Sequence, residues 1–444
     1  AKNALIYYKK NKRKKMANLK HKNFSANTLS LHAAYDYDKH RTLSVPIYQS
    51  SAYNFESLEQ AANRFALKEL GHTYSRITNP TRDILAQRLA AVEGGAFGAV
   101  TSSGTAAIFY AVLNLAESGD NILFANKIYG GTQTLFVHTL KRLGIQARVF
   151  DLDDASSIEP LIDSKTKAIF FESLSNPQIA IADVEAITAI AKKHGIITIC
   201  DNTVATPLLY RPFEYGVDIS IHSLTKYING HGSVLGGAMI EREGLNELIR
   251  GNPRYQDFNS PDESYHGLIY ANLDLPIFSI RFITHWLRNT GASLSPQDAW
   301  LHIQGLETLE LRIQKHSDSA LAIAEFLEDH HLIDEVSYPA LKSSPYYKLL
   351  QKYFVGGRAS GLLSFEARSF EAAQKICNNL ELFSITANIG DSKSLIIHPY
   401  STTHSQLSQS ELESAGITPK TIRLSVGLES TQDLIKDLKK AIES

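Results

Sequence analysis

Short apolar segments alternate with helical stretches along residues 98–241, and this alternation limits the fold more than any other feature of the sequence. The expected helices cover residues 106–116, 132–143 and 184–194. Strands that alternate with helices pair in parallel through right-handed crossovers. We therefore predict an α/β fold with a mostly parallel seven-stranded sheet between helices. Its strands are expected in GAVTSS, NILFAN, ARVFDL, AIFFES, IITICDN, ISIHSL and AMIE.

A single lysine follows one of these expected strands. In ISIHSLTKYINGHGSVLGG, residues 219–237, Lys226 comes after Ser223 and Thr225 and before a glycine-rich turn. A residue just beyond the end of an apolar strand lies at the edge where α/β sheets bind their ligands. Most lysines are simply solvent-exposed, so Lys226 alone does not predict a site.

An acidic residue ends the preceding expected strand. Asp201 closes IITICDN, twenty-five positions before Lys226. A pyridoxal 5′-phosphate site needs an amine that forms an imine with the cofactor and an acid that pairs with the ring nitrogen. The hydroxyl groups of Ser223 and Thr225 are of the kind that hold a phosphate. Together these residues predict a pyridoxal phosphate site.

A turn of small residues supplies a second candidate phosphate contact. Ser103, Gly104 and Thr105 open an expected helix, whose free N–H groups and dipole suit an anion. The turn matches neither the dinucleotide nor the nucleoside-triphosphate pattern, and a nicotinamide dehydrogenase would need the former. Small residues also cap helices for purely structural reasons, so the turn supports the site without establishing it.

Composition limits the remaining classes of protein. The 444 residues are 43% hydrophobic and 20% charged, which is typical of a globular protein of two or three domains. Two cysteines, Cys200 and Cys377, are too few for a disulfide framework or a cysteine metal site. We expect Cys200 to be a buried thiol, and we expect no metal. No run of about 18 apolar residues occurs, so we expect a cytoplasmic protein without a membrane partner.

The first sixteen residues are unusually basic. They hold seven Lys and Arg residues and no acid, which leaves 38 basic and 46 acidic residues in the remainder. Such a tail could bind nucleic acid or a membrane, and a polyanion-binding protein is the non-enzymatic alternative. We instead expect residues 1–15 to be a non-native or upstream leader before Met16, with no nucleic-acid partner.

The rest of the chain divides into three predicted parts. Residues 16–78 form an extended arm with one helix near residues 57–70, and an arm without its own core must lie on the body or on a partner chain. Residues 79–277 form the large domain, which opens with a helix over 81–92. Residues 278–444 form a smaller α+β domain, with breaks at Gly291 and Pro296. Its expected elements are GLLSFEA, residues 370–380, ITANIGD and TIRLSVG.

Three motifs carry a family resemblance. Lys226 within SLTKYINGHG, Asp201 within CDNTVATP, and YSRITNPT together resemble the Cys/Met-metabolism family of pyridoxal-phosphate enzymes. The resemblance runs from about residue 28 to residue 438. It implies the same fold, namely an N-terminal arm, a large domain with a mostly parallel sheet, and a smaller C-terminal domain.

The resemblance also implies roles for individual residues. Lys226 would bind the cofactor covalently and move protons, Asp201 would pair with the ring nitrogen, and Tyr129 would stack on the ring and assist proton transfer. The positions that match the phosphate-binding residues of the family are Ser103, Gly104, Thr105, Ser223 and Thr225.

Substrate and subunit contacts are implied in the same way. Arg423 resembles the arginine that binds the substrate α-carboxylate, and an arginine inside an apolar strand needs such an anion. Asn176 matches an asparagine near the ring and the carboxylate. Tyr74 and Arg76 match residues that reach the phosphate of a neighbouring subunit, and Tyr74 also takes part in catalysis. We therefore expect a homo-oligomer with shared active sites, and a tetramer rather than a dimer.

Three positions bear on the reaction. Asn388 stands where lyases more often carry serine, Thr402 where lyases and cystathionine synthases often carry methionine, and Gly131 where methionine γ-lyases carry a cysteine. They favour the O-acetylhomoserine sulfhydrylase members of the family, which convert O-acetyl-L-homoserine and sulfide to L-homocysteine and acetate in methionine biosynthesis. Tyr400, at a position that is usually alanine, departs from the pattern. Methionine γ-lyase and cystathionine γ-synthase or lyase activities at the same site stay open.

Overall fold

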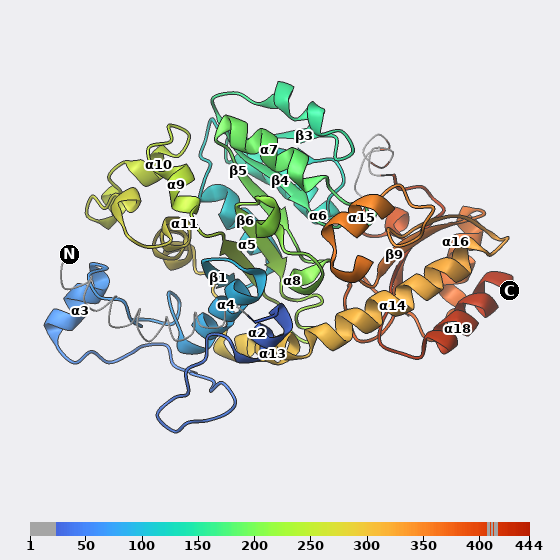
Figure 1. Cartoon of the computed structure of the whole chain (residues 1–444), viewed down its shortest axis with the longest axis horizontal. Helices are drawn as coiled ribbons and strands as arrows, with labels where there is room; N and C mark the ends of the chain where they lie inside the picture. Colours follow the sequence, from blue (N-terminus) through green and yellow to red (C-terminus); the bar gives the residue numbers. More distant parts are fainter. Residues whose placement is uncertain (1–23, 406–408, 410–411, 413–415) are drawn as a thin grey trace.

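The computed structural model describes residues 24–405, 409, 412 and 416–444. The expected leader, residues 1–15, lies outside this described part. Figure 1 shows a larger lobe built around one sheet and a smaller lobe that carries the C-terminus, with the long helix α14 (Leu309–Glu328) running into the smaller lobe. In the described part of the chain, no helix combines the length and the apolarity needed to cross a membrane.

A seven-stranded sheet forms the centre of the larger lobe, which confirms the predicted fold class. The strand order is β1-β7-β6-β5-β4-β2-β3, and only β7 runs antiparallel to its neighbours. Most strands are buried along their length, as expected for a parallel sheet covered on both faces. The bounds are β1 (Phe97–Thr101), β2 (Asn121–Ala125), β3 (Gln146–Phe150), β4 (Thr166–Glu172), β5 (Ile197–Asp201), β6 (Ile219–Ser223) and β7 (Gly237–Glu241).

The helices between these strands begin and end at recognisable capping residues. In α4 (Pro80–Glu93), the Asn79 side chain accepts from Thr81 N–H, and Gly94 ends the helix with a φ of 84°. In α5 (Gly104–Leu113), the Ser103 hydroxyl accepts from Ala106 N–H, so this helix begins two residues before the expected position. The helix α7 (Val184–His194) has its predicted bounds.

The prediction of a regular α-helix over residues 132–143 is wrong in the type of helix. The chain instead forms a short helix, α6 (Gly130–Thr134), that continues as a π-helix over Leu135–Leu140. A period of 3.6 residues cannot reveal this change, because both helix types bury Leu135, Phe136 and Leu140 on one side.

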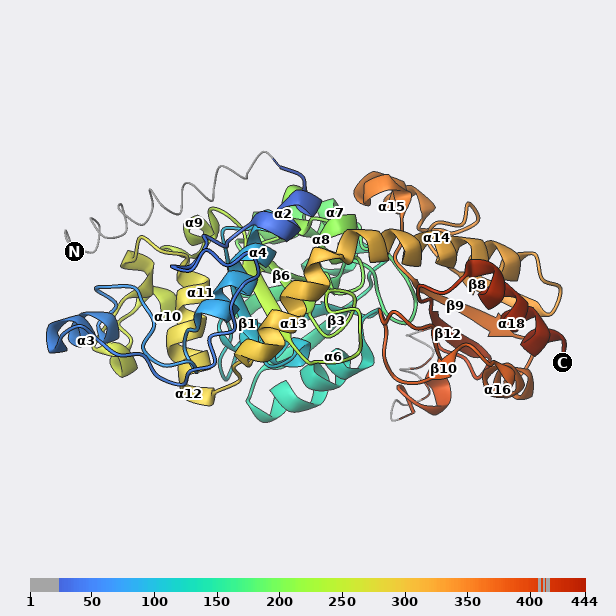
Figure 2. The same cartoon turned by 90° about the horizontal axis from the view of Figure 1, so that it is seen from below.

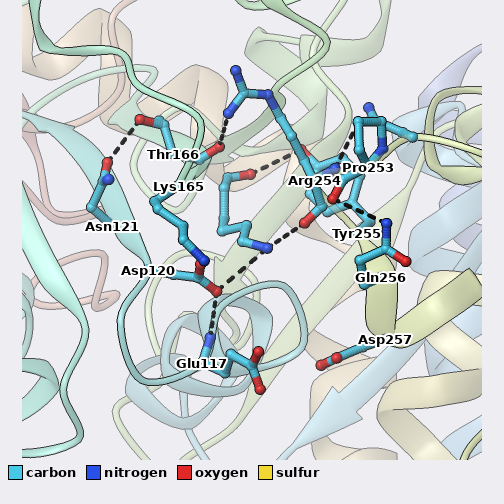
Figure 3. Close-up of polar contacts among 12 residues, drawn as sticks. Glu117, Asp120, Asn121, Lys165, Thr166, Pro253, Arg254, Tyr255, Gln256 and Asp257 are labelled. Atoms are coloured by element: carbon cyan, nitrogen blue, oxygen red, sulfur yellow. Dashed lines mark hydrogen bonds and ion pairs between the residues drawn. The ribbon is translucent and has the colours of Figure 1, made fainter. Parts of the chain in front are cut away.

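Polar side chains close the amino edge of the sheet (Figure 3). The Lys167 ammonium lies 3.4 Å from the Asp120 carboxylate. The Arg254 guanidinium donates to Thr166 O at 2.8 Å. It also donates to Asp163 O at 2.8 Å. The Tyr255 hydroxyl donates to Lys167 O at 2.9 Å. These groups are hydrogen-bonded or ion-paired to one another, so the amino edge is a structural network. Ligands of α/β folds bind at the opposite, carboxyl edge of the sheet.

The helical region after residue 276 breaks where the sequence predicts. Helix α11 (Ile277–Arg281), a π-helical turn over Phe282–Leu287 and α12 (Arg288–Thr290) end at Gly291, whose φ is 80°. Pro296 then begins α13 (Pro296–Glu307), because a helix tolerates proline in its first turn. The remaining helices of the larger lobe are α8 (Thr206–Leu209), α9 (Leu245–Ile249) and α10 (Gln256–Asn259).

The smaller lobe contains a five-stranded sheet in the order β10-β11-β12-β9-β8. Helices α14 and α16 pack on β9. The strands are β8 (Ile333–Ser337), β9 (Leu362–Ala367), β10 (Ser384–Ile385), β11 (Leu395–Ile397) and β12 (Thr421–Ser425). Helices with described bounds here also include α15 (Tyr347–Tyr353), α16 (Phe370–Asn379) and α18 (Thr431–Glu443).

The expected element at ITANIGD is wrong for most of its length. Only its first residue, Ile385, is in a strand, and the sequence prediction missed β11 further on. Side chains bind the backbone here in place of a strand neighbour, since Asn388 O accepts from Arg423 and Gly390 N–H donates to Ser425 Oγ.

The N-terminal arm lies partly on the body and partly away from it. Helix α2 (Ala26–His32) packs against α4 and α13. Helix α3 (Leu58–Phe65), shorter than the predicted 57–70, has no buried residue, and its end residues Leu58 and Phe65 are 87% and 53% exposed. Figures 1 and 2 show α3 projecting at one end of the molecule. The arm therefore carries apolar side chains that the described part of its own chain leaves uncovered. The division at residues 79 and 278 stays a prediction.

Candidate active site

The candidate site lies at the carboxyl edge of the large sheet, where α/β folds bind ligands. Asp201 ends β5 and Glu172 ends β4, and these two residues are paired in register across the two strands. Lys226 follows the end of β6, and Tyr129 follows β2 as the N-cap of α6. Four neighbouring strands thus direct a lysine, two acids and a tyrosine to one edge.

The Lys226 side chain is partly buried and contacts the smaller lobe. Its Nζ donates to Asn388 Oδ1 at 2.7 Å. Burial, and then the positive charge of Arg423, lower the pKa of Lys226 to about 8. An amine with this pKa is neutral in a useful fraction of molecules near neutral pH, so Lys226 can act as a nucleophile and as a base.

Asp201 and Glu172 form a pair of acids at neighbouring strand ends, of which Glu172 is buried and Asp201 is partly buried. Asp201 Oδ1 accepts from the Thr203 hydroxyl at 2.5 Å and from Thr203 N–H at 3.0 Å. Burial raises the pKa of Asp201, and burial with the charge of Asp201 raises the pKa of Glu172 well above its usual range. Glu172 therefore keeps its proton more readily, and Asp201 is the acid that ionises to face a positive group.

Arg423 is a buried cation whose Nε has no hydrogen-bond partner among the described residues. It lies on β12, 4% exposed, and donates to Asn176 Oδ1 at 2.9 Å and to Asn388 O at 3.2 Å. Burial lowers the pKa of Arg423 to about 10, so the side chain is still charged at neutral pH. A buried charge with an unsatisfied donor suits an anionic ligand.

The small-residue turn after β1 lies against the loop that carries Lys226. A Cβ atom built on Gly104 would lie 2.5 Å from Ser223 Cβ, and one built on Gly237 would overlap the carbonyl of Ser103. The first N–H groups of α5, those of Gly104 and Thr105, have no partner within the helix. The Ser103 hydroxyl already caps the helix, and the Thr225 hydroxyl accepts from Gly236 N–H at 3.1 Å. The backbone N–H groups are therefore the best donors for a phosphate here.

Tyr129 presents its ring at the mouth of this region. Its N–H donates to Glu172 Oε1 at 2.7 Å, while its side chain is 44% exposed. A Cβ atom built on Gly131 would lie 2.5 Å from the ring carbon Cε1 of Tyr129. Glycine at position 131 therefore makes room for the Tyr129 ring.

Tyr74 and Arg76 lie elsewhere in the chain. The Arg76 guanidinium lies 5.4 Å from the centre of the Tyr74 ring and donates to Arg288 O. Both side chains are exposed, and none of the contacts described for them involves Lys226 or its neighbours. One chain alone does not bring these two residues to the site, so their role there stays a prediction that requires a second subunit.

Sequence reasoning missed two residues of the site. Glu172 ends an apolar strand as Asp201 does, so the same signal could have identified it. Thr203 fixes Asp201 and also accepts from Ser223 N–H at 2.7 Å, which links two neighbouring strand ends. Its position two residues beyond Asp201 gave no separate signal. Tyr400, the expected departure, packs against Leu412 and Ile417.

These residues fit pyridoxal phosphate. They supply an amine that can be neutral, an acid that can be ionised, free backbone donors beside a small-residue cradle, and a buried arginine with a donor to spare. A match to the family described as Cys/Met metabolism PLP-dependent enzymes covers residues 27–443. The chain belongs to this family. It is therefore a pyridoxal-phosphate-dependent enzyme with a small-molecule substrate.

The chain is also similar to individual members of the family whose activities are named. The chain is 40% identical to an O-acetyl-L-homoserine sulfhydrylase from Leptospira meyeri, over 95% of this chain and 98% of the relative. It is 43% identical to an O-acetyl-L-homoserine sulfhydrylase from Corynebacterium glutamicum, over 93% of this chain and 95% of the relative. The structure also superposes on a crystal structure from Campylobacter jejuni, with a TM-score of 0.94 and 63% sequence identity. That protein is named O-acetylhomoserine (thiol)-lyase. That comparison covers 95% of this chain and 100% of the other, which contains N′-pyridoxyl-lysine-5′-monophosphate.

Proposed function

We propose that this enzyme catalyses a γ-replacement in methionine biosynthesis, in which O-acetyl-L-homoserine and sulfide give L-homocysteine and acetate. The observation that carries the proposal is the position of the Lys226 amine, 2.7 Å from Asn388 Oδ1 and beside the charge of Arg423. This arrangement occurs in a chain that is 40% and 43% identical to two O-acetyl-L-homoserine sulfhydrylases.

The proposal assigns each binding role to a group at the site. Asp201 holds the ring nitrogen of the cofactor, and Lys226 binds the cofactor covalently. Arg423 and Asn176, which are already hydrogen-bonded to each other, hold the substrate α-carboxylate, with Asn388 beside them. Tyr129 covers the ring. The phosphate is held by the turn and loop residues Ser103, Gly104, Thr105, Ser223 and Thr225.

Lys226 carries the protons in this scheme. Pyridoxal phosphate, when bound, draws electron density from the α-carbon of the substrate. Lys226 Nζ, freed by the incoming amino group, takes the α-proton and later returns it. A second proton leaves the β-carbon, and acetate then leaves the γ-carbon as its C–O bond breaks. Sulfide forms the new C–S bond at the γ-carbon as a proton returns to the β-carbon. Asn388 Oδ1 holds the free amine between these steps, and Tyr129 assists the proton transfer.

The proposal extends to assembly and location. Tyr74 and Arg76 of one subunit complete the site of another, in a dimer that further pairs into a tetramer. The uncovered apolar side chains of α3 support this part, because an arm of this kind needs a surface to cover it. A cytoplasmic location is in keeping with Cys200 and Cys377, which are both buried free thiols.

Product analysis tests the proposal. The purified enzyme is incubated with O-acetyl-L-homoserine and sulfide, or with methionine alone. We expect homocysteine and acetate in equal amounts from the first mixture and far slower release of methanethiol from the second. Faster cleavage of methionine would instead identify a γ-lyase. The Lys226→Ala variant is the control and should form neither product.

A further inference from the structure

His404 is a buried histidine with an unused nitrogen. It is 2% exposed, and its backbone N–H donates to Pro399 O at 3.0 Å. Its Nδ1 lies 2.9 Å from the Thr403 hydroxyl oxygen. Its Nε2 is buried and has no hydrogen-bond partner among the described residues. Buried polar atoms nearly always have a partner, so an exception beside a candidate site requires an explanation.

The Nε2 and Cδ2 atoms of the imidazole face the larger lobe at Gly130, the residue after Tyr129. A Cβ atom built on Gly130 would lie 3.0 Å from both Nε2 and Cδ2 of His404. Glycine at 130 therefore lets the imidazole of the smaller lobe approach the start of α6 closely. Any larger residue there would have to displace this side chain.

A series of hydrogen bonds connects this edge to Arg423. Gly130 follows Tyr129, whose N–H donates to one oxygen of Glu172. The other Glu172 oxygen accepts from Asn176 N–H at 3.2 Å, and Asn176 Oδ1 accepts from Arg423. His404 and Arg423 thus reach the same end of the site from the smaller lobe.

The charge state of His404 follows from these surroundings. Burial, and then the positive charge of Arg423, lower the pKa of His404 to about 4. The imidazole is therefore neutral at ordinary pH, with a single N–H. When the Thr403 hydroxyl donates to Nδ1, that N–H is on Nε2 and points toward Gly130.

We propose that His404 is a substrate-binding residue, whose Nε2–H donates to the substrate α-carboxylate together with Arg423 Nε. Each terminal nitrogen of Arg423 has a partner, Asn176 or Asn388, and Nε is the nitrogen that has none among the described residues. A carboxylate has two oxygens and can satisfy both unpaired nitrogens at once. The inference rests on the proposed function, in which Arg423 holds this carboxylate.

Binding of two small amines to the cofactor-loaded enzyme tests the inference without turnover. Glycine keeps the amino and carboxylate groups of the substrate, and methylamine is the same molecule without the carboxylate. Their dissociation constants are measured by absorbance titration for the wild type and for His404→Gln, His404→Asn and His404→Leu. Glutamine places an amide N–H near the position of Nε2, whereas asparagine is too short to do so.

The expected result is specific to the carboxylate. His404→Leu and His404→Asn should weaken glycine binding by roughly 10- to 100-fold, the range for a lost hydrogen bond to a charged group. His404→Gln should restore most of that loss, and methylamine binding should stay unchanged in all three variants. Equal losses for glycine and methylamine, or equal behaviour of the Gln and Asn variants, would show that His404 only packs on Gly130.

The same titrations separate this inference from the proposed function. If Arg423→Gln leaves glycine binding unchanged, the carboxylate site itself is misplaced and the proposed substrate orientation fails. If Arg423→Gln weakens glycine binding and His404→Asn does not, only the role of His404 fails. Thermal unfolding of each variant checks that it is folded, and the Gln and Asn pair decides the question even if His404→Leu does not fold.

Discussion

At the scale of single residues, the site depends on charges that are buried close together. Lys226 would be a cation in water, but burial and Arg423 hold its pKa near 8. The negative charge of Asp201 disfavours a second negative charge on Glu172, so Asp201 ionises more easily than Glu172. Each group thus takes its protonation state from neighbours on other strands. In the proposed function, the amine and the acid prepared in this way bind the two ends of one cofactor ring.

The contribution of Arg423 to Lys226 gives a prediction about pH. The neutral amine reacts with the cofactor, so the rate of cofactor uptake by the apoenzyme should rise with pH to a midpoint near 8. Replacing Arg423 with glutamine removes a positive charge and should move this midpoint toward the ordinary lysine value of 10.5. The rate is measured by absorbance across pH. Arg423→Lys keeps the charge and should keep the midpoint. An unchanged or lower midpoint in Arg423→Gln would contradict the account.

The residues predicted from sequence are those with a strong local signal. Lys226 and Asp201 follow apolar strands, and their motifs carry a family resemblance. The contacts that define the site join positions far apart in the chain, such as Asn388 with Lys226 or Asn176 with Arg423. No local pattern encodes such distances. Thr203 binds Ser223 and His404 lies against Gly130 through contacts between other separated positions, so sequence alone gave them no role.

At the scale of elements, prediction was accurate where burial determines the structure. The strands of the large sheet and helix α7 follow from apolar periodicity. Apolar periodicity does not predict the structure of ITANIGD, where Arg423 and Ser425 bind the backbone of the segment and replace a strand partner. It also failed after Thr134, where the backbone changes to a π-helix without any change in apolar spacing. Both failures lie near the candidate site, where tertiary contacts override local preference.

One strand carries a buried acid that couples stability to pH. Glu241, at the end of β7, accepts from Ser279 N–H at 2.9 Å and so ties the sheet to α11. Burial raises the pKa of Glu241 from 4.5 to about 8. Between these two values the unfolded chain releases this proton more readily than the folded one. The free energy of unfolding should therefore fall as pH rises from 4.5, with the loss complete above about 8.

We predict that Glu241→Gln removes this loss, because glutamine resembles the protonated acid and can still accept from Ser279. The variant should match the wild type near pH 5 and exceed it above pH 8, by at most about 4 to 5 kcal/mol. Urea unfolding at several pH values measures the difference. Glu247→Gln, an exposed control, should show no such trend. A variant that is less stable than the wild type at pH 9 would refute the role of Glu241.

At the scale of the whole molecule, the arm is the part that a single chain does not explain. Helix α3 buries none of its residues, and Tyr74 and Arg76 lie exposed, with no described contact to Lys226. The family resemblance places these two residues at a neighbouring subunit. A shared site would account for both observations.

Mixing two inactive variants tests the shared site. Arg76→Ala and Lys226→Ala, each inactive alone, should regain part of the wild-type activity when their subunits exchange, because some mixed sites then contain both wild-type residues. Arg64→Ala is the matched control, since Arg64 pairs with Glu69 in its own chain, and this variant should stay active alone. No recovery under conditions of proven subunit exchange would show that each chain completes its own site.

The central claim is that Lys226 is the residue that holds the cofactor. The most direct measurement is borohydride reduction of the yellow enzyme, followed by proteolysis and mass spectrometry of the labelled peptide. The account predicts that the yellow absorbance is lost and that the reduced cofactor is found on Lys226 alone. A label on another lysine, or an enzyme that never acquires the absorbance when the cofactor is added, would contradict it.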